Sequence, residues 1–127
     1  MMTSKYIELA RILIQEVERN LQQVQPGQYI YYKQILMYTL YALGYAIDAL
    51  VESKLRKRPI GHGDRIHYLA EIGRTDLRDL YQNLIVMVFS KLETVMELRL
   101  EDLTNIVHKV REVIDKISEE VSQTQHV

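Results

Sequence analysis

The sequence has no cysteine and no tryptophan, one phenylalanine, two prolines and five glycines among its 127 residues. The lack of cysteine excludes a disulfide framework, cysteine-ligated zinc and a thiol nucleophile. So few prolines and glycines are atypical of turn-rich β-sandwiches and of low-complexity chains. The first residues lack the features of a signal peptide, and the apolar runs are too short for a bilayer. We therefore expect a cytoplasmic, all-α protein that does not contact a membrane.

The charges nearly cancel, because 16 Lys and Arg stand against 17 Asp and Glu. This balance excludes a globally basic nucleic-acid binder but leaves room for a local basic patch. Such a patch lies in residues 53–78, where seven basic residues stand against three acidic ones. Its candidate anion-binding residues are Lys54, Arg56, Lys57, Arg58, His62, Arg65 and His67. They either contact a phosphate, a nucleotide or RNA, or form a solvated loop that offsets a helix dipole.

Apolar residues recur every three or four positions over most of the chain, which predicts amphipathic helices. The four longest stretches cover residues 4–25, 29–56, 77–95 and 103–121. Pro26-Gly27 separates the first two, and the break between the last two should lie within residues 98–102. The second stretch is apolar on more than one side, which is typical of a central helix. It contains Gly44, and a glycine within a helix suggests close packing.

A shorter helix is expected between the second and third long helices, in residues 64–72. Asp64 is suited to cap its start, and Gly73 is suited to the left-handed residue after its end. Short connections between four amphipathic helices predict an up-and-down four-helix bundle with this one extra helix. We expect residues 1–127 to form a single domain, with a frayed tail at residues 123–127.

Nine tyrosines are present, and several share one face of the second predicted helix. Tyr31, Tyr38 and Tyr45 are seven residues apart, Tyr41 lies between them, and Asp48 follows one turn later. A tyrosine combines an apolar ring with a polar tip, which suits an interface or a half-wet groove. One interpretation is a ligand groove in which Asp48 accepts a hydrogen bond from the ligand. The other is packing in the core or in a dimer.

Catalytic constellations are sparse in this sequence. No helix carries a His-x3-His or Glu-x2-His pair, so we expect no metal site and no cofactor. Gly61-His62-Gly63 lacks the Lys-Ser/Thr pair of a phosphate-binding loop. Ser90 has no nucleophile elbow around it. The residues alone therefore favour a binding or interaction protein over an enzyme.

The order of helices resembles an archaeal helical family, the PaREP-type proteins, within the broader HEPN-like bundles. The resemblance covers residues 27–118 and rests on the Tyr- and Ala-rich stretch 38–50, the loop with His62, the short helix at 67–72 and the closing helix at 110–117. It implies a helical bundle that dimerises. HEPN-like proteins are either metal-independent ribonucleases with an Arg-x(4–6)-His motif or non-catalytic partners and binding modules.

Arg56 and His62 match the spacing of that motif and are the candidate catalytic residues which the resemblance implies. In the family the motif is expected near the later helices, whereas residues 96–105 contain no histidine. The leading hypothesis is therefore a non-enzymatic module, a homodimer that binds a partner protein or a small phosphorylated ligand. The alternative is a HEPN-like RNA-binding protein or ribonuclease that uses the basic loop.

Overall fold

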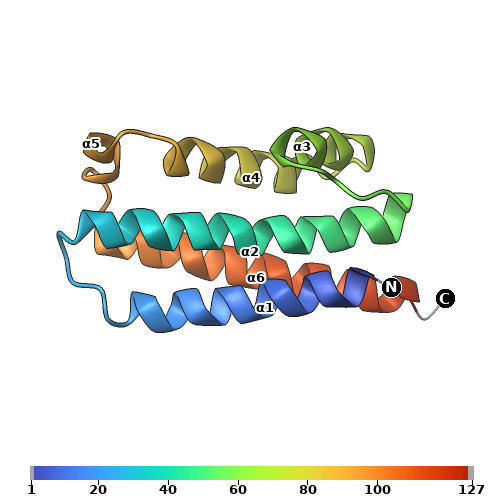
Figure 1. Ribbon diagram of the computed structural model, residues 1–127, viewed down its shortest axis with the longest axis horizontal. Helices are drawn as coiled ribbons and strands as arrows, with labels where there is room; N and C mark the ends of the chain where they lie inside the picture. Colours follow the sequence, from blue (N-terminus) through green and yellow to red (C-terminus); the bar gives the residue numbers. More distant parts are fainter. Residues whose placement is uncertain (1, 126–127) are drawn as a thin grey trace.

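The structure is a computed structural model that describes residues 2–125, and this part of the chain is helical without any strand. Its helices are α1 (Met2–Leu21), α2 (Tyr29–Leu55), α3 (His62–Glu71), α4 (Thr75–Val88), α5 (Leu92–Val95) and α6 (Leu100–Gln125). The longer helices α1, α2, α4 and α6 run in alternating directions along the chain (Figure 1). The all-α prediction is therefore confirmed, and α3 is the short helix expected before the third long one.

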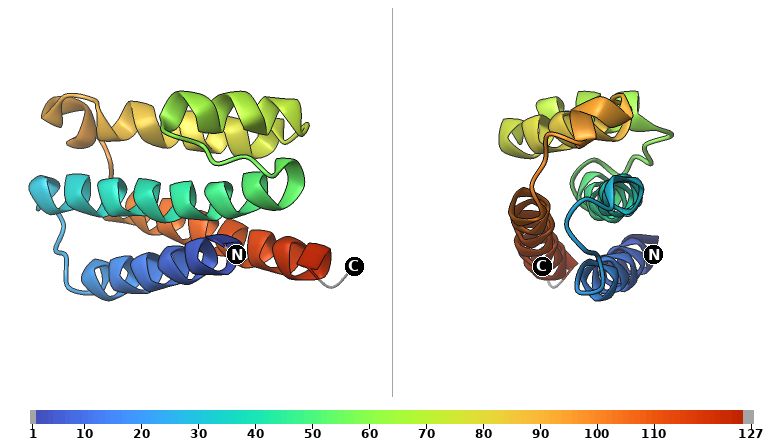
Figure 2. Two further views of the ribbon diagram at one scale, coloured as in Figure 1. Left: turned by 45° about the vertical axis from the view of Figure 1, so that its right-hand side comes forward. Right: turned by 90° about the vertical axis from the view of Figure 1, so that its left-hand side faces the viewer.

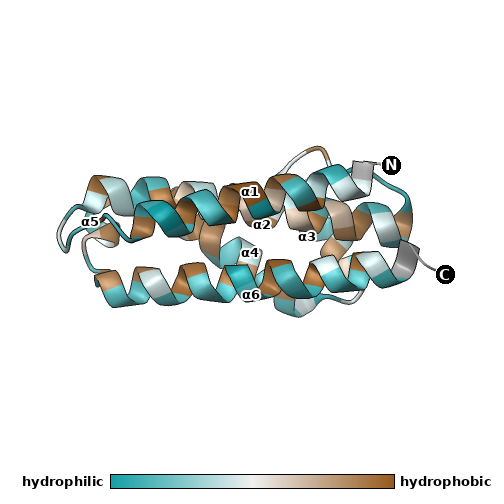
Figure 3. Cartoon of the chain, turned by 90° about the horizontal axis from the view of Figure 1, so that it is seen from below, coloured by the Kyte–Doolittle hydropathy of each residue, from teal (hydrophilic) through white to brown (hydrophobic). Residues whose placement is uncertain are grey.

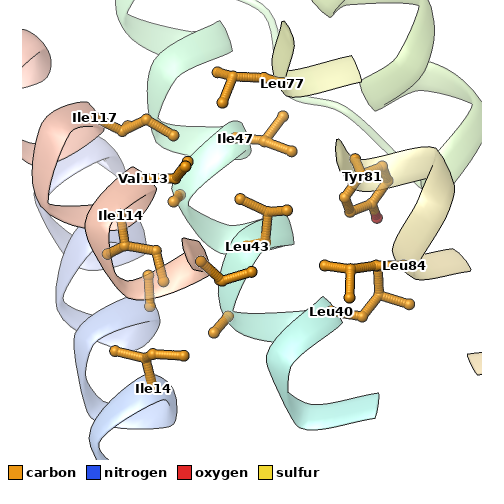
Figure 4. Close-up of a cluster of buried hydrophobic side chains, with 14 of the residues drawn as sticks. Ile14, Leu40, Leu43, Ile47, Leu77, Tyr81, Leu84, Val113, Ile114 and Ile117 are labelled. Carbon is orange, nitrogen blue, oxygen red and sulfur yellow. The ribbon is translucent and has the colours of Figure 1, made fainter. Parts of the chain in front are cut away.

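Helix α2 lies at the centre of the molecule, as its apolar pattern predicts. Seen from the end, α1 and α6 lie on one side of it and α3, α4 and α5 on the other (Figure 2). Leu40, Leu43 and Ile47 of α2 are buried in the apolar core that lies between these layers (Figure 4). Neighbours in this core include Ile14 of α1, Leu77, Tyr81 and Leu84 of α4, and Val113, Ile114 and Ile117 of α6.

The length and apolar composition of α2 correct one expectation about membranes. Its 27 residues are long and apolar enough to cross a bilayer by length and composition, although we expected no such stretch. However, 72% of its most apolar window is buried inside the protein, as in the core helix of a soluble protein. Helices α1 and α6, by contrast, carry hydrophilic residues between their apolar ones (Figure 3). Burial of one apolar stripe per helix accounts for that pattern.

Helices α1 and α2 both end earlier than predicted. Helix α1 ends at Leu21 rather than at residue 25, and short turns lead from there to Gly27, whose φ is 90°. Helix α2 ends at Leu55, because Arg56 adopts a left-handed conformation with φ of 57°. Its backbone N–H still donates to the carbonyl oxygen of Glu52, which closes the last turn.

Helix α3 begins at His62, two residues before the predicted start. Its N-cap is the extended Gly61, so the prediction that Asp64 caps the helix is wrong. The Asp64 carboxylate instead accepts a hydrogen bond of 2.8 Å from the backbone N–H of Ile60 in the preceding loop. Gly73 has a φ of 75°, the left-handed conformation predicted for it.

The third long helix is shorter than predicted, because it ends at Val88 rather than continuing to residue 95. No glycine or proline marks this end, but Lys33 of α2 donates a hydrogen bond to the Ser90 carbonyl oxygen. That carbonyl is thereby satisfied without a helical partner, and residues 92–95 form the separate helix α5. The predicted break in residues 98–102 is confirmed only in part, because residues 98 and 99 are not helical but α6 already begins at Leu100.

The predicted frayed tail is also corrected in part. Helix α6 continues to Gln125, so residues 123–125 belong to a helix, and residues 126–127 lie outside the described residues.

Candidate functional site

A buried ion pair joins α2 to α3. Arg65 of α3 donates from Nε to Oδ1 of Asp48 at 2.7 Å and from Nη2 to Oδ2 at 3.1 Å. The side chains of Arg65 and Asp48 are 18% and 7% exposed, so the pair is largely shielded from water. A fork of two N–H groups matches the two carboxylate oxygens and gives one of the stronger hydrogen-bonded arrangements in proteins. Arg65 donates to both oxygens of Asp48, and the acceptor role predicted for Asp48 toward a ligand stays a prediction.

Tyr81 and His62 extend this pair into a chain of four side chains. Nη1 of Arg65 donates to the Tyr81 hydroxyl oxygen at 2.8 Å, and that hydroxyl is hydrogen-bonded to Nδ1 of His62. Tyr81 is fully buried, whereas His62 is half-buried and has the exposed Phe89 ring against its side. The chain therefore runs from the interior at Asp48 toward the surface at His62.

Burial and charge set the protonation of this chain. Burial raises the pKa of Asp48 above its ordinary value, and the hydrogen bonds and charge of Arg65 offset part of the rise. For Arg65, burial alone would lower the pKa, but hydrogen bonds and attraction from Asp48 outweigh it and the pKa rises. A carboxylate that accepts two guanidinium N–H groups favours its charged form, so we treat the two residues as an ion pair.

The outer two members of the chain are neutral at pH 7. Burial raises the pKa of Tyr81 above its ordinary value, although the charge of Arg65 lowers it in part. Burial and then the nearby Arg65 charge lower the pKa of His62 below 6.5. His62 therefore offers an uncharged imidazole at the protein surface, which can accept or donate a hydrogen bond.

A cavity of about 470 Å³ opens above this chain, between α1, α2, α3 and the loop before α3. His62, Arg65 and Tyr81 supply its polar lining, and Leu13 and Leu40 supply apolar surface. Gly44 also lines it, and the Arg65 guanidinium carbon lies 3.5 Å from the place a Cβ would occupy there. Arg65 packs over Gly44 at an ordinary contact distance, so the close packing expected to require glycine there is not confirmed.

The tyrosine stripe of α2 contributes a wall to the cavity rather than a part of the core. Tyr38, Tyr41 and Tyr45 line it, and Tyr31 lies further along the helix beside a second depression. Tyr31, Tyr38 and Tyr41 are 52%, 42% and 46% exposed, whereas Tyr45 is half-buried and stacks on Tyr6 of α1. The structure therefore corrects the core interpretation for the three exposed tyrosines.

The basic residues grouped by the sequence divide into three sets. Arg65 and His62 enter the cavity. Lys57 lies over the Tyr68 ring at 5.4 Å, and the exposed His67 packs beside the same ring. The side chains of the remaining bases form no ion pair or hydrogen bond within residues 2–125, and these bases are Lys54, Arg56 and Arg58.

The structure does not join Arg56 to His62 as the motif spacing suggests. Arg56 is exposed at the end of α2, and the arginine that lies in the hydrogen-bonded chain with His62 is Arg65. Tyr81 was missed as a site residue, because its spacing with Leu77 and Leu84 indicates a core position. It is a core residue whose hydroxyl group also reaches the site.

Within residues 2–125 no group of three or more histidines and carboxylates is arranged to hold a metal ion. Comparisons of the chain with protein families, with curated proteins and with solved structures give no match.

Proposed function

We propose that this protein is a non-enzymatic helical binding module, and that its cavity above Asp48 and Arg65 holds a small ligand with an oxyanion and a flat ring. A small phosphorylated aromatic compound is an example of such a ligand. The observation that carries the proposal is a 470 Å³ cavity with hydrogen-bond donors at one end and tyrosines along its wall. Cavities of this size are typical of small-molecule sites.

The polar end of the cavity offers mostly donors. A guanidinium has five N–H groups, and Arg65 uses one for each of its three hydrogen bonds to Asp48 and Tyr81. Two N–H groups remain without a partner among the described residues, and the imidazole of His62 adds a polar group beside them. Both oxygens of Asp48 already accept hydrogen bonds. A ligand that fits this end must therefore supply acceptors, which phosphate and carboxylate groups do.

The opposite wall favours a flat ring. Tyr38 and Tyr41 pack edge to face with ring centroids 6.3 Å apart, and Tyr45 lies one turn further along α2. Aromatic pairs of this kind are worth about 0.5–1.5 kcal/mol beyond simple burial. A ring bound against Tyr38 and Tyr41 would gain that contact while its oxyanion reaches Arg65.

Isothermal titration calorimetry with phenyl phosphate and benzoate tests this proposal. The variant Tyr38→Leu removes one aromatic ring from the cavity wall. It should weaken binding of both probes about threefold to tenfold, because one aromatic contact is lost. Tyr31→Leu is the matched control, because Tyr31 is also exposed on the same helix but does not line this cavity. Equal affinities in the wild type and both variants, or no binding of either probe, would overturn the proposal.

We also propose that α1, α2, α4 and α6 are the four helices of a bundle that forms a homodimer. The support is the exposed tyrosine face of α2, since large exposed aromatic patches usually mark an interaction surface. Replacing Tyr31 and Tyr38 together by glutamate should then convert a dimer to a monomer in sedimentation velocity. A wild-type monomer, or a dimer unaffected by both changes, would remove this part of the proposal.

The second candidate function is HEPN-like RNA binding or cleavage. A neutral histidine beside an arginine favours it, because such a histidine can move a proton while the arginine contacts phosphate. In this structure the pair would be His62 with Arg65 rather than with Arg56. RNA cleavage that is lost in His62→Ala and retained in Arg56→Ala would support ribonuclease activity. Cleavage that survives His62→Ala would indicate a contaminating nuclease.

A further inference from the structure

The hydrogen bonds around Tyr81 assign the proton on His62. A tyrosine hydroxyl has one hydrogen to donate and two lone pairs that accept. Arg65 donates to this hydroxyl, and the only other partner found among the described residues is Nδ1 of His62. Among the described residues the hydroxyl hydrogen finds an acceptor only if Nδ1 is unprotonated. A neutral His62 then carries its hydrogen on Nε2, at the end of a chain that leads outward from Asp48.

We propose that the cavity binds its oxyanion together with one proton, which His62 takes up at Nδ1. This inference rests on the proposed function and names the proton linkage of the same site. Solvent or buffer supplies the proton, and no covalent bond to the ligand forms or breaks.

Protonation reverses one hydrogen bond and frees one donor. Once Nδ1 of His62 carries a hydrogen, it donates to the Tyr81 hydroxyl oxygen, which still accepts from Arg65. Both lone pairs of that oxygen are then in use, so the hydroxyl hydrogen must turn to a new acceptor. Tyr81 lines the cavity, and an oxyanion bound there is such an acceptor.

The charges around His62 explain why an anion brings a proton with it. From α2, Asp48 contributes a negative charge, and from α3, Arg65 contributes a positive charge that cancels it. Asp64 of α3 accepts a hydrogen bond from the Ile60 backbone, and Tyr81 of α4 is neutral. The other titratable groups that line the cavity are Tyr38, Tyr41 and Tyr45. An anion in this cavity therefore meets no net positive charge until His62 becomes an imidazolium.

A first experiment needs no ligand. Nitrogen-15 NMR of the imidazole groups in the free protein at pH 7.5 distinguishes the two neutral tautomers of histidine. We expect His62 to be the Nε2–H form, with Nδ1 unprotonated, whereas the exposed His67 should sample both forms. A predominant Nδ1–H form at His62 would overturn the inference, whatever the protein binds.

The second experiment counts protons. Benzoate is the probe, because its carboxylate does not titrate near neutral pH, and calorimetry in two buffers with different ionisation enthalpies gives the protons taken up. An adjacent anion favours the charged form of a histidine and raises its pKa, so we expect net proton uptake on binding at pH 7.0. His62→Gln, which keeps a donor of similar shape, should bind benzoate with no uptake, and His67→Gln should behave as the wild type.

The outcomes separate the two proposals. Benzoate that binds the wild type without proton uptake would overturn the proton linkage and leave the binding function intact. Uptake that persists in His62→Gln would assign the proton to another group and would also overturn it. If neither benzoate nor phenyl phosphate binds, the proposed function fails, and the proton linkage fails with it.

Discussion

At the scale of single residues, Asp48 is the feature of α2 that packing alone does not explain. It is a charged side chain in the most buried helix of the protein, and it keeps its charge only because Arg65 donates to both of its oxygens. Buried ion pairs add little net stability, because desolvation cancels most of the attraction. Arg65 of this pair lines the cavity, so the proposed site gives a reason for the pair that the needs of the fold do not.

Removing one partner of the ion pair should lower the free energy of unfolding far more than removing both. Asp48→Asn leaves the Arg65 guanidinium without its counter-charge, and we expect the free energy of unfolding to fall by about 3–5 kcal/mol. The double variant Asp48→Leu with Arg65→Met removes both charges and should lie within about 1–2 kcal/mol of the wild type. Urea unfolding of both proteins measures the difference. Equal losses in the single and double variants would contradict the importance of charge pairing.

The lowered pKa of His62 predicts how stability depends on pH. The unfolded chain holds the His62 proton more tightly than the folded protein does, so unfolding becomes easier as protons become available. The free energy of unfolding should therefore fall as the pH drops through about 6.5 toward the lowered pKa of the folded protein. This fall should be smaller in His62→Gln. Identical pH profiles for the wild type and His62→Gln would count against the lowered pKa.

The sequence predicted which residues form the site better than it predicted which of them contact one another. Asp48 and Arg65 were both named as candidates, yet in separate sets, because they are 17 positions apart and a loop of unknown path separates them. Helical spacing can relate residues only within one element. Tyr81 was missed for a related reason, since a buried tyrosine and a site tyrosine have the same spacing and differ only in the partner of the hydroxyl.

At the scale of elements, the ends of the helices around the cavity determine which basic residues reach it. Helix α2 ends because Arg56 is left-handed, and the chain then crosses to start α3 at His62. This start places His62 and Arg65, three residues apart, on the side of α3 that lines the cavity. Arg56 itself stays outside as a structural residue of the helix end.

Arg56→Gly tests that structural role. A left-handed conformation costs a non-glycine residue about 1–2 kcal/mol, and glycine avoids this cost while losing more freedom on folding. We expect a net stabilisation of about 0.5–1 kcal/mol in urea unfolding, with no change in benzoate affinity. Arg58→Gly is the matched control without a positive φ, and it should not stabilise the protein. Loss of stability in Arg56→Gly would show that its side chain contributes more than its backbone conformation costs.

Gly44 offers a second test at this scale. A methyl group there would lie 3.5 Å from the Arg65 guanidinium carbon, which is an ordinary contact. Gly44→Ala should therefore be tolerated and gain up to about 1 kcal/mol of helix propensity. Gly44→Leu would extend into the place of the guanidinium, so it should destabilise the protein by displacing Arg65. Equal stability of the two variants in urea unfolding would contradict the close approach of Arg65 to the helix.

Most elements could be predicted because each buries one apolar stripe, and a stripe is visible in the sequence. The exception is the end of α4, where the apolar spacing continues from Val88 to Leu92 although the helix does not. Just beyond this end, the Ser90 carbonyl oxygen accepts a hydrogen bond from Lys33, which lies 57 residues away on α2. Such a tertiary contact cannot be read from local spacing, and no glycine or proline marks the end of the helix.

At the scale of the whole molecule, the cavity lies where two layers of helices meet on α2. Helices α1 and α2 form one wall, and α3 with its preceding loop forms the other. Ion pairs brace this frame away from the cavity, because Arg74 at the start of α4 donates to Glu120 of α6, and Arg111 of α6 pairs with Glu18 of α1. These ion pairs join the helices at places other than the cavity.

The most direct test of the account asks where an oxyanion binds on the whole protein. Phenyl phosphate titrated into nitrogen-15-labelled protein should shift the backbone NMR signals of Gly61, His62 and Arg65 together with those of α2 beside the cavity. The account predicts a saturable response centred on these residues. Shifts confined to the exposed bases at residues 54–58, without saturation, would show that the anion meets only a solvated basic loop and would contradict a binding site in the cavity.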